Sequence, residues 1–230
     1  MAPLDAAQTR AFLSAHSGLP GPRGNLELLA AFGDVAPAEL VLALVGSDDE
    51  YLAACAAAAL GRLVADADAA GARRAETVDL LRAQASDQRW RVREGVAMAL
   101  QRLGDADAAG LRAVVAAWAD DADPLVQRAA VAGICEPRLL ATRATAEAAL
   151  DACRRATASL AERDPAQRRG DVRVLRQGLG YCWSVAIAAV PERGLPAFAA
   201  LATSTDPDVA WIVRENRKKS RLARLLAPAG

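Results

Sequence analysis

The sequence repeats a short motif at a spacing that constrains the fold. The pattern Trp-x-Val-Arg-Glu occurs at Trp90–Glu94 and again at Trp211–Glu215, 121 residues further along the chain. This separation is close to three units of about 40 residues, and self-similarity at such a period is typical of helical solenoids. Leu60–Leu63 also matches Leu100–Leu103 at an offset of 40. The sequence therefore predicts an all-α solenoid of stacked helix pairs.

Turn and capping residues divide the chain into about twelve helices, or six pairs. No segment shows sustained two-residue alternation with strand-forming residues, so we expect no sheet and a single repeat domain over residues 1–230. Asn25 and the stretch Ser47–Glu50 are expected to cap helices, Gly104 is expected to end one, and Pro196 and Asp206-Pro207 are expected to begin the last two. The other expected helices cover residues 4–16, 26–32, 37–45, 51–66, 70–84, 88–104, 107–119, a unit opening at 123, 138–162 and 170–190.

Composition argues against several classes of protein. Hydrophobic residues make up 53% of the chain, which is too many for a disordered protein. Charged residues interrupt every apolar run, so we expect no membrane span, and the first ten residues lack the apolar core of a signal peptide. The four cysteines are scattered, which favours buried thiols in a reducing, cytoplasmic setting over a disulfide framework. They are Cys55, Cys135, Cys153 and Cys182.

Charge is balanced over the whole chain but unevenly distributed along it. Residues 1–80 carry 5 basic and 11 acidic side chains, whereas residues 81–230 carry 23 and 17. The run from Arg214 to Arg224 holds six cations and one carboxylate. It is interpreted either as the polar outer face of a final capping helix or as an edge that contacts phosphates.

The repeated motif can be placed on a helix that turns about 100° per residue. With Val92 at zero, four apolar residues fall within about 80° of it and form a buried face. They are Val96, Ala99, Leu100 and Leu103. Trp90 and Glu94 fall near 160° and 200°, so this i, i+4 pair is expected to stand together away from the core.

Arg128 occupies the same position in the next unit that Glu94 holds in its own. Stacked helices lie about 8–10 Å apart, so we expect Glu94 and Arg128 to be neighbours on one ridge, on the concave side of the solenoid. One interpretation is an ion pair between repeats, which contributes little if exposed. The other is a binding or catalytic pair beneath the indole of Trp90.

These units resemble HEAT-like repeats, with Asp-Pro-x-Val-x-Arg openings and Ala-x-x-Leu-x-x-Leu-Gly closings. More narrowly, residues 86–200 resemble the HEAT-like alkylpurine DNA glycosylases of the DNA alkylation repair superfamily. That family pairs a tryptophan with an aspartate four residues later, where this chain has Trp90 and Glu94. Its groove arginine matches Arg128 within Leu125–Ala130, and its second groove tryptophan corresponds to Tyr181 or Trp183. Glutamate for aspartate and tyrosine for tryptophan are departures from the family pattern.

The resemblance implies a basic concave groove that binds duplex DNA and excises cationic alkylated purines without a metal or cofactor. Trp90 with Tyr181 or Trp183 would stabilise the cationic base through cation–π contacts, and Glu94 would stabilise positive charge on the sugar. Arg128 and the basic C-terminal run would hold phosphates. On this hypothesis the DNA-contacting residues of that run would be Arg214, Arg217, Lys218, Lys219 and Arg221. Non-catalytic lesion binding is an open variant of this hypothesis.

The competing hypothesis is a non-enzymatic scaffold that binds a protein or peptide in its groove. Under either hypothesis we expect a monomer. Classical hydrolase and zinc motifs are missing from the sequence. The single histidine, His16, is interpreted as a capping or surface residue rather than a base. The loop Gly18–Asn25 lacks the Gly-Lys-Ser/Thr ending of a phosphate-binding loop, which favours a structural turn.

Overall fold

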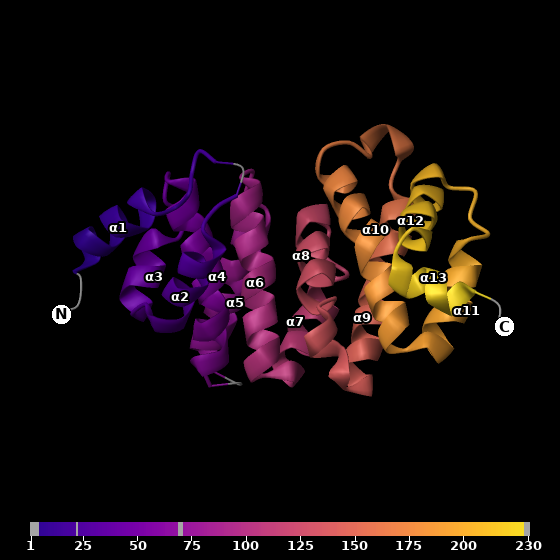
Figure 1. The fold of residues 1–230 in the computed structure, drawn as a ribbon, viewed down its shortest axis with the longest axis horizontal. Coiled ribbons are helices and arrows are strands. Elements are labelled where there is room, and N and C mark those ends of the chain that lie inside the picture. The colour runs from indigo at the N-terminus through magenta and orange to yellow at the C-terminus, as the bar shows by residue number, and fades with distance from the viewer. Residues whose placement is uncertain (1–4, 22, 69–70, 228–230) are drawn as a thin grey trace. The chain divides into compact units, whose positions relative to one another are not determined.

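The computed structural model describes residues 5–21, 23–68 and 71–227. Within these ranges the protein contains thirteen α-helices, two short 3-10 helices and no strand, which confirms the all-α solenoid class (Figure 1). Contacts between Cα atoms divide the chain into two compact units, Met1–Ala106 and Asp107–Gly230, which are described in turn. That residues 1–230 form one repeat domain stays a prediction. No helix in the described ranges has the length and apolarity needed to cross a membrane.

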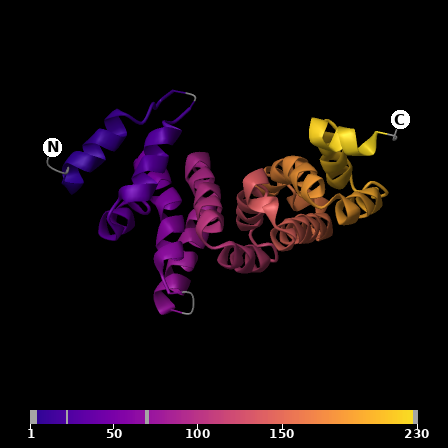
Figure 2. The same ribbon diagram turned by 60° about the horizontal axis from the view of Figure 1, so that its bottom comes forward.

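Unit 1 is organised around α4. Helix α4 contacts α1, α2, α3, α5 and α6, and the contact with α6 is the most extensive. Figures 1 and 2 both show α4 and α6 side by side. The expected caps at Asn25 and Asp49 are confirmed, because each side chain accepts hydrogen bonds from the first turn of its helix. The helices are α1 (Ala6–Ala15), α2 (Leu26–Val35), α3 (Ala38–Leu44), α4 (Glu50–Asp66), α5 (Ala72–Ala85) and α6 (Trp90–Ala106).

Small residues bring the backbones of α4 and α6 close together. Every residue from 51 to 60 on α4 is buried, and six of these ten are alanines. A Cβ atom added at Gly61 would overlap the carbonyl oxygen of Ala99 and lie 2.6 Å from its Cα atom. A Cβ atom at Gly95 of α6 would lie 2.6 Å from the carbonyl oxygen of Ala54. A helix that is apolar on all sides belongs in the interior, and α4 forms the centre of this unit.

Unit 2 is organised around α10, which contacts α8, α9, α11, α12 and α13. The buried amide of Asn216 joins α12 to α10, since it accepts a hydrogen bond from the Ser184 amide and donates to the Leu179 carbonyl. The helices are α7 (Ala108–Trp118), α8 (Pro124–Ile134), α9 (Arg143–Glu162), α10 (Asp171–Ala189), α11 (Pro191–Leu201), α12 (Pro207–Arg217) and α13 (Ser220–Leu226). The 3-10 helices are η1 (Pro137–Ala141) and η2 (Pro165–Gln167).

Several expected helix boundaries are wrong, each for a local reason. Helix α6 continues through Gly104 to Ala106 before Asp107 caps the next helix. The helix expected over 138–162 is divided, because Thr142 caps a new helix by accepting a hydrogen bond from the Thr145 amide.

The C-terminal part also differs from the expectation. Helix α11 begins at Pro191, which suits the first helical position, and Pro196 lies inside it. The basic run is not one helix, because α12 ends at Arg217 and α13 begins at Ser220, which raises the number of α-helices from the expected twelve to thirteen. Leu4 and Ala70, which the sequence places in helices, lie outside the described residues.

Candidate nucleic-acid interface

The helical repeat motif on α6 is oriented as the sequence predicts. All five residues of the expected apolar face, from Val92 to Leu103, are fully buried. Trp90 is 51% exposed, and Glu94 is half-buried. The indole and the carboxylate therefore stand away from the core.

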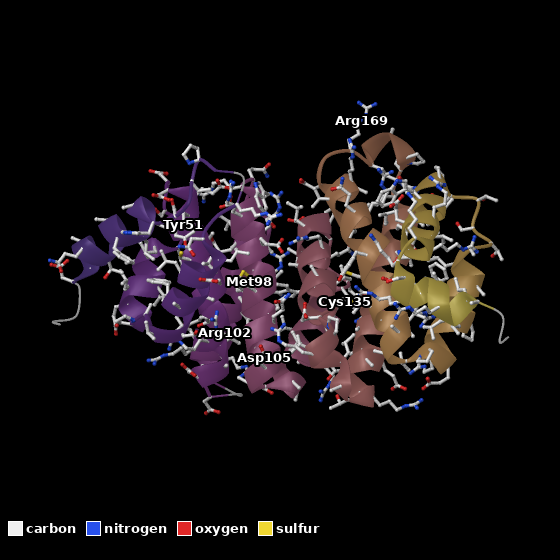
Figure 3. All side chains as sticks on the ribbon, viewed as in Figure 1. Tyr51, Met98, Arg102, Asp105, Cys135 and Arg169 are labelled. Carbon is white, nitrogen blue, oxygen red and sulfur yellow. The ribbon has the colours of Figure 1, made fainter. Side chains whose placement is uncertain are left out.

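Trp90 and Glu94 line one small hollow of unit 1, together with Leu26 of α2 and residues of α4 and α6. Figure 3 labels two of its lining residues, Tyr51 and Met98. The hollow has a volume of about 30 Å³. Small-molecule sites usually measure about 300–1,000 Å³, so this hollow does not enclose a nucleobase.

One face of the exposed indole is covered by a neighbouring side chain. The guanidinium of Arg91 lies 4.6 Å from the centroid of the Trp90 ring. Arg91 is held there by an ion pair of 2.9 Å with Glu50 on α4. Trp90 thus keeps a single face for a ligand.

Arg128 is half-buried on α8 and packs against α10 of the same unit. Its Cγ atom lies 3.4 Å from the position that a Cβ atom at Gly178 would occupy. Glu94 belongs to unit 1 and Arg128 to unit 2, so their expected proximity stays a prediction. The roles of Trp90, Glu94 and Arg128 in catalysis are likewise untested.

Tyr181 of α10 is 43% exposed and carries two cations on its ring. The Arg221 guanidinium lies 4.9 Å from the ring centroid and donates a hydrogen bond of 2.9 Å to the phenol oxygen. The Lys219 ammonium lies 5.6 Å from the same centroid. Gly178, against which Arg128 packs, is one turn before Tyr181 on α10, so Arg128 reaches the same side of that helix. We call Arg128, Tyr181, Lys219 and Arg221 the basic face.

The buried thiol of Cys182 follows Tyr181 on α10. A hydrogen bond with Cys135 and burial raise the pKa of Cys182, while the positive charges of Arg128 and Arg221 act in the opposite direction. All four cysteines are buried and free, as the sequence predicts.

Two further cations of the basic run, Arg214 and Lys218, lie near the carboxylate of Glu215. The Lys218 ammonium is 2.6 Å from Glu215, and this contact lowers the pKa of Glu215, with smaller contributions from Lys219 and Arg214. Arg214, Arg217 and Lys218 are exposed. Positive charge thus exceeds negative charge along the edge formed by α12 and α13.

Trp183 is buried, so its side chain is not part of the exposed surface of the candidate interface. Its side chain is 1% exposed, its indole N–H donates a 3.0 Å hydrogen bond to the hydroxyl of Thr157 on α9, and its ring packs near Phe198. Residues two positions apart on a helix are separated by about 200° around its axis. Trp183 therefore faces α9, while Tyr181 faces the opposite side of α10. The tryptophan of the second motif copy, Trp211, also packs against its neighbours. Its ring lies against Gly180, and the Arg176 guanidinium lies over it.

Other groups in the described residues do not form a reactive centre. No group of three or more histidine, cysteine or carboxylate side chains in those residues is arranged to hold a metal ion. His16 is the C-terminal cap of α1 and stacks on Phe12 with ring centroids 4.1 Å apart. Gly18 has a positive φ of 74°, as a tight turn before Asn25 requires.

The family comparison agrees with the helical repeats. Residues 37–135 match the family model described as HEAT repeats. The match spans α3 to α8 and includes both α4 and α6. The fold defines the class as an all-α helical-repeat protein, and residues 37–135 are similar to HEAT repeats.

The similarity of the chain to individual solved structures is low. Three crystal structures of engineered proteins from the Northeast Structural Genomics Consortium align with the chain. The first has 18% identity and a TM-score of 0.38, covering 96% of this chain and 92% of its own. The second has 21% identity and a TM-score of 0.40, and the alignment covers 98% of this chain and 55% of that one. The third has 19% identity and a TM-score of 0.38, and the alignment covers 92% of this chain and 91% of that one.

No curated protein matched the chain. The comparisons do not support the DNA alkylation repair superfamily, so that resemblance stays a hypothesis.

Proposed function

We propose that this HEAT-repeat protein binds duplex DNA, with the basic face of unit 2 as its phosphate-contacting surface. The observation that supports the proposal most is the half-exposed Tyr181 ring with Lys219 and Arg221 on it. Cations of this kind release counterions from DNA when they contact phosphates, which supplies non-specific affinity. Unit 2 carries 18 basic and 14 acidic side chains, so its charge favours a polyanion.

The chemistry of the basic face suits phosphates in particular. Guanidinium groups present a planar fork of donors that matches phosphate oxygens, and Arg128 and Arg221 supply two of them. The half-exposed ring of Tyr181 adds an apolar surface against which a sugar or base can pack. An acidic protein segment is the competing ligand, and it lacks the closely spaced charges of a duplex.

Replacing Arg221 with glutamine is expected to weaken duplex binding about tenfold at low salt and to reduce the salt slope by about one. The matched control is Arg154→Gln on α9, which removes the same charge from an exposed arginine on the Trp183 side of α10. Fluorescence anisotropy with a labelled duplex measures both variants. Equal losses in the two variants would contradict the proposal. Saturable binding of polyglutamate with none of DNA would instead support the protein scaffold.

A second candidate function is metal-free excision of cationic alkylated purines. The observation that favours it is that the exposed Trp90 indole and the Glu94 carboxylate line the same hollow. Because the hollow is too small for a base, the base would rest on the open face of the indole. Glu94 would then stabilise positive charge that develops on the sugar.

Glu94→Gln is expected to lower the rate of 7-methylguanine excision by at least about 100-fold, since the variant keeps the shape but loses the charge. Glu27→Gln, an exposed carboxylate on α2, is the control and should keep the parental rate. The measurement is base release from alkylated duplex under single-turnover conditions. Excision by Glu94→Gln at the parental rate would remove Glu94 from this role.

A further inference from the structure

A second concave site lies in unit 2, between α9 and the pair α11 and α12. It has a volume of about 430 Å³, which lies within the range of small-molecule sites. Trp183, Leu201 and Val209 contribute apolar surface to its lining. Four alanines, at positions 158, 161, 197 and 200, line the walls on α9 and α11 and leave space between them because their side chains are small.

The polar groups of this cavity have one sign of charge. Two arginines, Arg154 and Arg155, line it, and none of its lining residues is acidic. The two hydroxyl groups in the lining are already engaged, since Thr157 accepts from Trp183 and Ser204 accepts from the Asp206 amide. A ligand therefore meets an apolar interior and a cationic rim.

The two arginines differ in how firmly they are held. Arg155 is paired with Asp120 and also donates to the carbonyl of Ala116, which fixes it between α7 and α9. Arg154 is 57% exposed and makes a longer contact of 3.4 Å with Asp151 on its own helix. An exposed ion pair of this kind contributes little to the free energy of folding. Arg154 can therefore exchange Asp151 for a ligand anion with little loss of stability.

We propose that this cavity binds a small organic anion with an extended apolar body, of the class of medium-chain carboxylates. The chain would lie between the alanines of α9 and α11, and the carboxylate would pair with Arg154. An arginine–carboxylate pair supplies a charge-assisted hydrogen bond, and burial of the chain supplies the apolar contribution. This site is separate from the basic face, because it includes Trp183, which points away from Tyr181 on α10.

Decanoate is the probe, and isothermal titration calorimetry on the full chain is the measurement. We expect one saturable site with a dissociation constant on the order of 0.1 mM. Ala200→Phe is expected to block the cavity and abolish binding. Its control is Ala199→Phe, which adds the same ring to the adjacent exposed alanine outside the cavity and should leave binding unchanged.

Charge is tested separately from shape. Arg154→Gln is expected to weaken decanoate binding about fivefold to tenfold, whereas Arg143→Gln, an exposed arginine elsewhere on α9, should have no effect. Decanol should bind more weakly than decanoate. Absence of saturable binding, unchanged binding by Ala200→Phe, or equal affinity for decanol would each overturn the proposal. Decanoate binding can fail while DNA binding remains, because the cavity is separate from the basic face. Ala200→Phe is accordingly expected to bind duplex DNA like the parent.

Discussion

Replacing Gly61 with alanine is expected to destabilise unit 1 by about 3 kcal/mol, at the upper end of ordinary overpacking effects. The added methyl would overlap the carbonyl oxygen of Ala99 on α6, and this obstacle is backbone rather than a flexible side chain. Helices α4 and α6 would have to separate, which exposes the buried alanines between them. Urea unfolding followed by circular dichroism measures the change in free energy of unfolding.

The control for this prediction is glycine to alanine at position 178 on α10. A Cβ atom there would meet only ordinary contacts, at 3.4 Å from Arg128 and 3.9 Å from Val131. Alanine is favoured over glycine inside a helix, so Gly178→Ala is expected to stabilise unit 2 by about 0.5–1 kcal/mol. If Gly61→Ala is as stable as the parent, the close approach of α4 and α6 is wrong.

Replacing Asn216 with alanine is expected to destabilise unit 2 by about 3 kcal/mol, at about 1 kcal/mol for each of three hydrogen bonds. The side chain is fully buried and bonds the Ser184 amide at 2.8 Å, the Leu179 carbonyl at 2.9 Å and the Ile212 carbonyl at 2.8 Å. Its loss removes the polar link between α10 and α12. The midpoint of chemical unfolding, compared with that of the exposed control Gln177→Ala, measures the effect. A difference below about 1 kcal/mol would show that this link is not structural.

Local sequence signals account for much of the fold. The apolar face of α6 was predictable because its spacing follows the helical period, and the caps at Asn25 and Asp49 were predictable from residue type. Helix ends were less so, because Pro191 and Pro196 are both compatible with a helix start and tertiary packing chooses between them.

The candidate interface depended more on long-range contacts. Tyr181 and Trp183 are two residues apart on one helix, and only the position of α9 determines which of them is buried. The sequence singled out Tyr181, Lys219 and Arg221 individually, but their contact joins residues 40 positions apart. The role of Asn216 gave no recognisable signal, because a buried asparagine within a basic run resembles any other polar residue.

The basic face is proposed to bind duplex DNA through its cations. The most direct test is an anisotropy titration of the parent protein with a labelled duplex at about 50 mM and about 200 mM salt. Three phosphate contacts, from Arg128, Lys219 and Arg221, predict an affinity that falls about 40-fold between these conditions. Absence of binding at the lower salt concentration, or an affinity that does not change with salt, would contradict the claim.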